Sequence, residues 1–182
     1  MRKDGNIYIR LLSLDDVHDF LQFEKNNQDF FQTYTMKRSP EYYTIEFQKD
    51  LFNEKIEKAK NDSEYNFGIF KRDNDELIGT IGLFRILRGP LQSAIVGYSL
   101  SKDHNGKGYA TEAVKLVVEY AFTTLKLHRI EAGVMPHNIG SIRVLEKAGF
   151  EKEGISKSNV KINGKWEDHQ VLAIINPDES SL

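Results

Sequence analysis

The segment at residues 104–113 (HNGKGYATEA) constrains the fold most, because it joins a strand pattern to a helix pattern through two glycines. The preceding residues 94–100 (AIVGYSL) are rich in the β-branched and aromatic side chains that are typical of strands. After the segment, apolar residues recur at the spacing of one buried helix face: Ala110, Ala113, Val114, Val117, Ala121 and Leu125. A strand, a glycine turn and a helix leave free backbone N–H groups at the helix N-terminus, where they can bind an anion.

The two glycines of this turn suit a phosphate group. Gly106 and Gly108 can adopt a positive φ and let a phosphate approach the backbone, with Thr111 as a hydroxyl donor and Lys107 as a charge. The turn is neither a GxxxxGK[ST] loop nor a GxGxxG motif with an acidic residue about twenty positions later. Because two glycines can also simply reverse the chain, a phosphate site needs a second signal.

The second signal lies further along the chain. Residues 127–135 (LHRIEAGVM) predict another strand, and residues 139–150 (IGSIRVLEKAGF) predict the helix that follows it. Asn138 stands at the N-cap position of this helix, and Gly149 stands at the left-handed position that ends many helices. Phe150 is then expected to fold back on Leu145.

Together the motifs NGKGYATEA and NIGSIRVLEKAGFEKEG resemble the signature of the GCN5-related N-acetyltransferase (GNAT) superfamily. More narrowly, they resemble the branch that contains the ribosomal-protein-alanine N-acetyltransferases. The resemblance extends from Ile9 to Ile175. It implies an α+β fold with a mixed, mostly antiparallel central sheet of about seven strands, helices on both faces and the element order βααβββαβαββ.

The remaining patterns agree with this order. Strands are predicted at residues 7–12, 65–71, 77–86 and 93–100, and a final hairpin at 154–162 and 165–175 around Asn163-Gly164. One helix is expected after Leu14, and another from Ser39-Pro40 to about Lys60. We expect a single domain over residues 1–176 and a polar tail at 177–182.

Composition excludes several functional classes. The chain of 182 residues has no cysteine, which excludes disulfides, thiolate metal sites and a cysteine acyl-enzyme. A formal net charge of −2 shows no excess of basic residues for binding nucleic acid. No apolar stretch approaches the length of a membrane span. We therefore expect a cytoplasmic protein without a metal and without nucleic acid or membrane partners. A monomer and a homodimer both remain open.

The resemblance implies acetyl-coenzyme A as the acyl donor. Its pyrophosphate is expected on the glycine turn, at Asn105, Gly106, Lys107, Gly108, Tyr109, Ala110 and Thr111. The acyl-pantetheine arm is expected where the two central strands splay apart, in contact with Tyr98, Ser99, Leu100, Asn138, Ser141 and Arg143. Asn105 stands where the superfamily usually has Gln or Arg, a difference that leaves the backbone cradle intact.

The resemblance also implies direct transfer, in which the acceptor amine attacks the thioester carbonyl and a backbone N–H stabilises the oxyanion. Many superfamily members supply a Tyr donor from the second helix, but Leu145 stands at that position. The ribosomal-protein branch has a Ser one turn earlier, where this chain has Ser141; this residue could instead bond its own helix. Glu131 is the candidate base, with an ion pair to Arg129 as an equal alternative.

The favoured acceptor is the N-terminal α-amine of a protein, with a ribosomal protein as one candidate. Such an amine titrates near ~8, against ~10.4 for a lysine side chain, and needs little help to lose its proton. The alternatives are a small amine (a polyamine, an amino acid or an antibiotic) and a non-catalytic acyl-CoA-binding module. The aromatic residues Phe30, Phe31 and Tyr34 either bind the acceptor or pack in the core.

Overall fold

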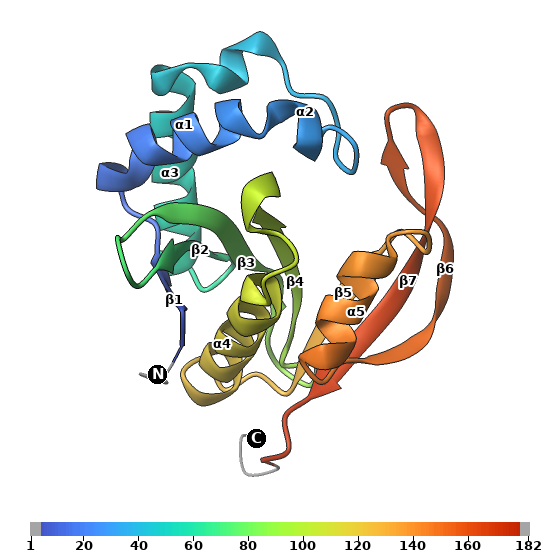
Figure 1. The fold of residues 1–182 in the computed structure, drawn as a ribbon. Coiled ribbons are helices and arrows are strands. Elements are labelled where there is room, and N and C mark those ends of the chain that lie inside the picture. Colours follow the sequence, from blue (N-terminus) through green and yellow to red (C-terminus); the bar gives the residue numbers. More distant parts are fainter. Residues whose placement is uncertain (1–4, 179–182) are drawn as a thin grey trace.

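The computed structural model describes residues 5–178 as one seven-stranded sheet with helices packed against it (Figure 1). The strands are β1 (Ile7–Leu11), β2 (Tyr65–Lys71), β3 (Leu77–Leu87), β4 (Ser93–Leu100), β5 (Arg129–Val134), β6 (Glu151–Ile162) and β7 (Lys165–Ile175). The α-helices are α1 (Val17–Asn26), α2 (Gln28–Phe31), α3 (Ile45–Lys60), α4 (Tyr109–Thr123) and α5 (Ile139–Lys147). Short 3-10 helices are η1 (Leu14–Asp16), η2 (Pro40–Tyr43) and η3 (Lys102–His104). Residues 179–182 of the predicted tail lie outside the described residues.

The strand order is β1-β2-β3-β4-β5-β7-β6, and every neighbouring pair is antiparallel except β4 and β5. These two strands pair in parallel only from Ser93↔Arg129 to Ile95↔Glu131. Beyond that point β4 stays paired with β3, and β5 stays paired with β7. The two central strands therefore separate toward their C-terminal ends, as the resemblance implied, and the predicted mixed sheet is confirmed.

Helices cover both faces of the sheet, because alternate residues of a strand point to opposite sides. Ile7 and Ile9 of β1 belong to the larger core, which includes residues of α4 and α5. Tyr8, between them, packs in a second core with residues of α1 and α3. None of the helices in residues 5–178 has the length and apolar composition needed to cross a bilayer.

The two central helices begin and end as the sequence predicts. All six apolar residues of the predicted face of α4 are buried. At the end of α5, Gly149 has a φ of +102°, and the N–H of Phe150 donates to the carbonyl of Leu145 at 3.0 Å. Asn138 caps the start of α5, since its Oδ1 accepts from the N–H of Ser141 at 3.3 Å. Both caps use contacts within a few residues, which a local pattern can predict.

The prediction of one helix from Ser39 to about Lys60 is wrong. Pro40–Tyr43 forms the 3-10 helix η2, and α3 begins only at Ile45. Thr44 between them is extended, with φ −99° and ψ 151°, and its Oγ1 accepts from the N–H of Phe47 at 3.4 Å. A threonine N-cap thus starts a new helix where the Ser-Pro start signal alone indicated a continuous one.

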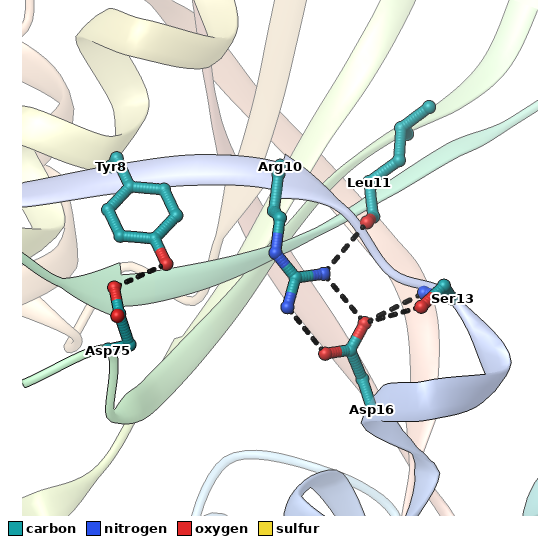
Figure 2. Close-up of polar contacts among 6 residues, drawn as sticks. All are labelled: Tyr8, Arg10, Leu11, Ser13, Asp16 and Asp75. Atoms are coloured by element: carbon teal, nitrogen blue, oxygen red, sulfur yellow. Dashed lines mark hydrogen bonds and ion pairs between the residues drawn. The ribbon is translucent and has the colours of Figure 1, made fainter.

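An ion pair between the half-exposed Arg10 and the buried Asp16 fixes the passage from β1 to α1 (Figure 2). Both carboxylate oxygens of Asp16 accept from the guanidinium of Arg10, at 2.7 and 2.8 Å, and the N–H of Ser13 donates to Asp16 at 2.8 Å. The same guanidinium lies 4.2 Å from the ring centroid of Phe70 in the second core. Burial raises the pKa of Asp16, but the hydrogen bonds and charge of Arg10 and Ser13 outweigh burial and leave this pKa below its ordinary value.

Asp16→Asn is expected to lower the free energy of unfolding at neutral pH by about 1–2 kcal/mol, because the amide loses the ion pair with the partly screened Arg10. The folded pKa of Asp16 lies below the unfolded value, so this stabilisation is complete above the unfolded pKa and is lost as pH falls through the folded pKa. Urea unfolding should therefore show a smaller difference between wild type and variant at about pH 3. An equal difference at both pH values contradicts the assignment. The control Asp50→Asn, on the exposed face of α3, should change stability by less than about 0.5 kcal/mol.

Candidate active site

Two cavities meet where β4 and β5 separate. The larger, of about 500 Å³, lies against the N-terminal ends of α4 and α5. The smaller, of about 200 Å³, lies between β4, β5 and β7. The two share the lining residues Tyr34, Thr35, Tyr98, Asn138 and Ser141. Two ligands, one in each cavity, could therefore meet at these shared residues.

Every predicted cofactor residue except Lys107 lines the larger cavity. These residues are Tyr98, Ser99, Leu100, Asn105, Gly106, Gly108, Tyr109, Ala110, Thr111, Asn138, Ser141 and Arg143. The predicted acceptor residues Phe30, Phe31 and Tyr34 line the same cavity.

Other lining residues of the larger cavity were not predicted: Thr35, His104, Gly140, Val144 and Lys147. Gly140, Val144 and Lys147 recur at helical spacing on the face of α5 that carries the cavity, so periodicity could have indicated them. Thr35 lies in a poorly periodic segment that gave no such signal.

The glycine turn presents its backbone to this cavity. Gly106 and Gly108 have φ values of +76° and +82°, and a Cβ added at either would meet no heavy atom within 4 Å. The N–H of Glu112 reaches back to the carbonyl of Gly108 at 3.1 Å, and the N–H groups before it in the first turn of α4 have no intrahelical acceptor. Arg143 and Lys147 add positive charge from α5. The free backbone N–H groups, the dipole of α4 and the two cationic side chains together fit a ligand with several phosphates.

The loop before the glycines is braced by its own side chains. Asn105 Nδ2 donates to the carbonyl of Ser101 at 3.1 Å, and Ser101 Oγ lies 2.9 Å from His104 Nδ1. The buried Asn27 donates to the carbonyl of Phe23 at 2.9 Å and accepts from the N–H of Lys102 at 2.9 Å. Asn27 thus ties the end of α1 to the start of the turn, a role that no local pattern indicated.

Ser141 and Tyr98 face each other where the cavities meet. Tyr98 OH lies 2.7 Å from Ser141 Oγ, and either atom can be the donor. Because Asn138 caps the helix, the Ser141 hydroxyl is engaged with Tyr98 rather than with its own helix. Burial raises the pKa of Tyr98, and the hydrogen bond from Ser141 lowers it by less. Tyr98 therefore keeps its proton at neutral pH and can donate it to Ser141.

Glu131 lies apart from these hydroxyls. Its Oε1 accepts from Arg129 Nε at 2.8 Å, and Arg129 also pairs with Glu153. Among the described residues, the linings of both cavities omit Glu131, and its side chain is 40% exposed. The role of Glu131 as a base stays a prediction, and its geometry matches the ion-pair alternative.

The aromatic residues after α1 join the second core to the cavities. The ring centroid of Phe31 lies 5.4 Å from that of Phe23, and Phe30 lies 5.9 Å from Phe31. Tyr34 makes an edge contact with Phe30 at 6.4 Å and lines both cavities. Phe31 packs against the second core, as the packing alternative predicted, whereas acceptor binding by the residues that border the cavities stays a prediction.

Comparison with known proteins decides the family. The family described as "Acetyltransferase (GNAT) domain" matches residues 6–151. The chain belongs to this acetyltransferase family. It is 59% identical, over 98% of its length and 99% of the relative's, to the probable N-acetyltransferase YjcK of Bacillus subtilis.

Two solved structures are also similar to this acetyltransferase. The ribosomal-protein-S5-alanine acetyltransferase from Vibrio fischeri has a TM-score of 0.91 and 32% identity, with 97% of each chain covered. RimJ of Mycobacterium smegmatis, in complex with CoA-disulfide, has a TM-score of 0.88 and 25% identity, with 96% of this chain and 86% of that chain covered.

The protein is therefore an acetyl-CoA-dependent N-acetyltransferase. This result confirms the predicted superfamily, enzyme class and acyl donor, and it removes the alternative of a non-catalytic acyl-CoA-binding module. Residues 5–178 contain no group of three or more His, Asp or Glu side chains that could hold a metal ion.

Gly108→Ala is expected to raise the Kd for acetyl-CoA at least about tenfold, because a Cβ enters the space through which a phosphate reaches the backbone. The control Gly164→Ala carries the same kind of backbone strain, since Gly164 has a φ of +88° in the β6–β7 turn, far from the glycine turn in sequence. Calorimetry should show an unchanged Kd for the control. Equal Kd values in the two variants contradict a phosphate site at Gly108.

Proposed function

We propose that this enzyme acetylates the N-terminal α-amine of a protein whose first residue is small and uncharged. The observation that carries the proposal is the lining of the smaller cavity. It consists largely of apolar side chains and glycine backbone: Val96, Gly97, Ala132, Gly133, Val134, Met135, Leu145 and Ile162. A cavity of about 200 Å³ with such walls suits a small side chain better than a long or charged one.

A polyamine acceptor fits this lining poorly. Buried cationic groups need carboxylate partners, and in the part of the chain that the structure describes no Asp or Glu lines either cavity. Glu24 lines an adjoining space of about 40 Å³, where the charge of Arg38 acts on it. This space shares Phe31, Thr35 and Ser99 with the larger cavity. The likeness to an enzyme named for acetylating a ribosomal protein's alanine also supports a protein acceptor.

The two cavities suggest separate roles. Acetyl-CoA supplies an activated acyl group as a thioester. We assign its phosphates to the glycine turn, the N-terminus of α4 and the charges of Arg143 and Lys147. The edge of β4 that has left β5 offers backbone N–H groups to orient the acyl carbonyl and stabilise an oxyanion.

The hydroxyl pair would complete the transfer. Ser141 gives its proton to the leaving sulfur, and Tyr98, 2.7 Å away, returns a proton to Ser141. Phe30 and Tyr34 would contact the acceptor near its first residues. We further place the enzyme in the cytoplasm, where acetyl-CoA and newly made proteins meet. The proposal makes no choice between a monomer and a homodimer.

Mass spectrometry of a mixed acceptor pool tests the proposed function. With acetyl-CoA and a pool of peptides that differ in their first residue, we expect acetylation of peptides that begin with Ala, Ser or Gly. Peptides that begin with Lys or Glu should react at least about tenfold more slowly, because a charge would be buried without a partner. Spermidine in the same pool is the matched competitor. A higher kcat/KM for spermidine than for every peptide contradicts the proposal.

Ser141→Ala is expected to lower kcat at least about 100-fold with little change in the Kd for acetyl-CoA, because it removes a proton donor and little binding area. Tyr98→Phe should lower kcat in the wild-type background, but not in the Ser141→Ala background, if Tyr98 acts through Ser141. Tyr120→Phe is the control, since Tyr120 is a partly buried tyrosine of α4 that lines neither cavity. Additive losses in the double variant contradict the relay.

A further inference from the structure

His169 lies on β7 at the wall of the smaller cavity. The residue is 8% exposed, and it lines this cavity together with Gly133 of the neighbouring strand. A Cβ added at Gly133 would lie 3.5 Å from His169 Cδ2, so the imidazole ring covers the backbone of Gly133. A side chain at position 133 would fill part of the space beside the His169 ring, and glycine leaves this space open.

Within the described part of the chain, the imidazole of His169 lacks a hydrogen-bond partner at its buried ring nitrogen. His169 Nδ1 is buried and has no hydrogen-bond partner among residues 5–178. Leaving a buried polar atom unpaired costs roughly 1–3 kcal/mol, and most buried polar atoms in proteins are paired. An apolar side chain at position 169 would avoid this cost, because the surrounding lining is largely apolar. Because Nδ1 has no exposed surface, a ligand in the cavity reaches the ring through the other nitrogen, Nε2, which has no hydrogen bond among the described residues either.

The position of His169 relative to the hydroxyl pair is also informative. Ser141 and Tyr98 line both cavities, whereas His169 lines only the smaller one, which we assign to the acceptor. In addition to His169, the titratable side chains of that lining are Tyr34 and Tyr98. An amine that occupies this cavity therefore has the imidazole and the hydroxyl pair in the same wall lining.

We propose that His169 accepts the proton that the acceptor amine loses during acetyl transfer. The imidazole takes this proton as the C–N bond to the acyl carbon forms, and it later releases the proton to water. Ser141 gives a proton to the sulfur as the C–S bond breaks, Tyr98 restores the proton of Ser141, and Tyr98 then regains a proton from water. Ser141 is then the acid and His169 the base, and they act from the two sides of the acyl carbon.

A histidine is suited to this step. A neutral imidazole has one nitrogen that accepts a hydrogen bond and can take up a proton. Glu131, the base that the sequence suggested, is held by Arg129 at 2.8 Å. The proposal rests on the proposed function only for the assignment of the smaller cavity to the acceptor.

The test compares His169→Gln and His169→Ala with wild type, using whichever amine of the mixed pool the wild-type enzyme acetylates. Glutamine keeps a polar side chain of similar reach but cannot take up the proton. Both variants should lose at least about 100-fold in kcat while the calorimetric Kd for acetyl-CoA stays unchanged. Added imidazole should restore kcat of His169→Ala at least about tenfold, because it can enter the space that the side chain left. His18→Ala is the control, since His18 is exposed on α1 and lines neither cavity.

Two outcomes overturn the proposal. If His169→Gln keeps kcat within about threefold of wild type, no proton transfer by His169 is needed. If both variants lose kcat but imidazole restores none of it in His169→Ala, the residue only shapes the cavity. Neither outcome depends on the identity of the acceptor, which the wild-type pool experiment decides by itself.

Discussion

The short parallel pairing of β4 with β5 is the constraint on which the site depends. Three residue pairs join the strands, and from there each strand is held only by its other neighbour, β3 or β7. The facing backbone groups are thereby free of the sheet ladder and available to a ligand. The N-terminal ends of α4 and α5 line the larger cavity, and Ile162 and His169 of the β6–β7 hairpin line the smaller one.

The two cavities differ in the charge of their linings, a difference that agrees with the proposed separation of acetyl-CoA from the acceptor. Arg143, Lys147 and the N-terminus of α4 make the larger cavity positive, as phosphates require. Among residues 5–178, the smaller cavity has no Lys, Arg, Asp or Glu in its lining, and its polar side chains are Tyr34, Thr35, Tyr98, Asn138, Ser141 and His169. Parts of the chain far apart in sequence close it, because Ile162 of the hairpin and Tyr34 after α2 both line it. The N–H of Lys37 also donates to Asn163 Oδ1 in the hairpin turn, at 3.3 Å.

Sequence patterns predicted elements whose stabilising contacts are local. The buried face of α4, the Asn138 cap and the Gly149 ending of α5 depend on residues within a few positions of each other. The error at Thr44 also has a local cause: a Ser-Pro start and a Thr cap follow each other closely, and only one was recognised. Most of the cofactor site follows from a motif of this local kind.

The sequence by itself therefore determined the order of elements, the glycine turn, the acyl donor and the hydroxyl at Ser141. Only the tertiary structure decided which other residues each side chain contacts. It brought Tyr98 to Ser141 across 43 positions and Asn27 to Lys102 across 75, and among the described residues it left Nδ1 of His169 unpaired beside the smaller cavity. The physical reason is that helix and strand periodicity specify which face a residue occupies, whereas the packing of the sheet and helices specifies the opposing residue.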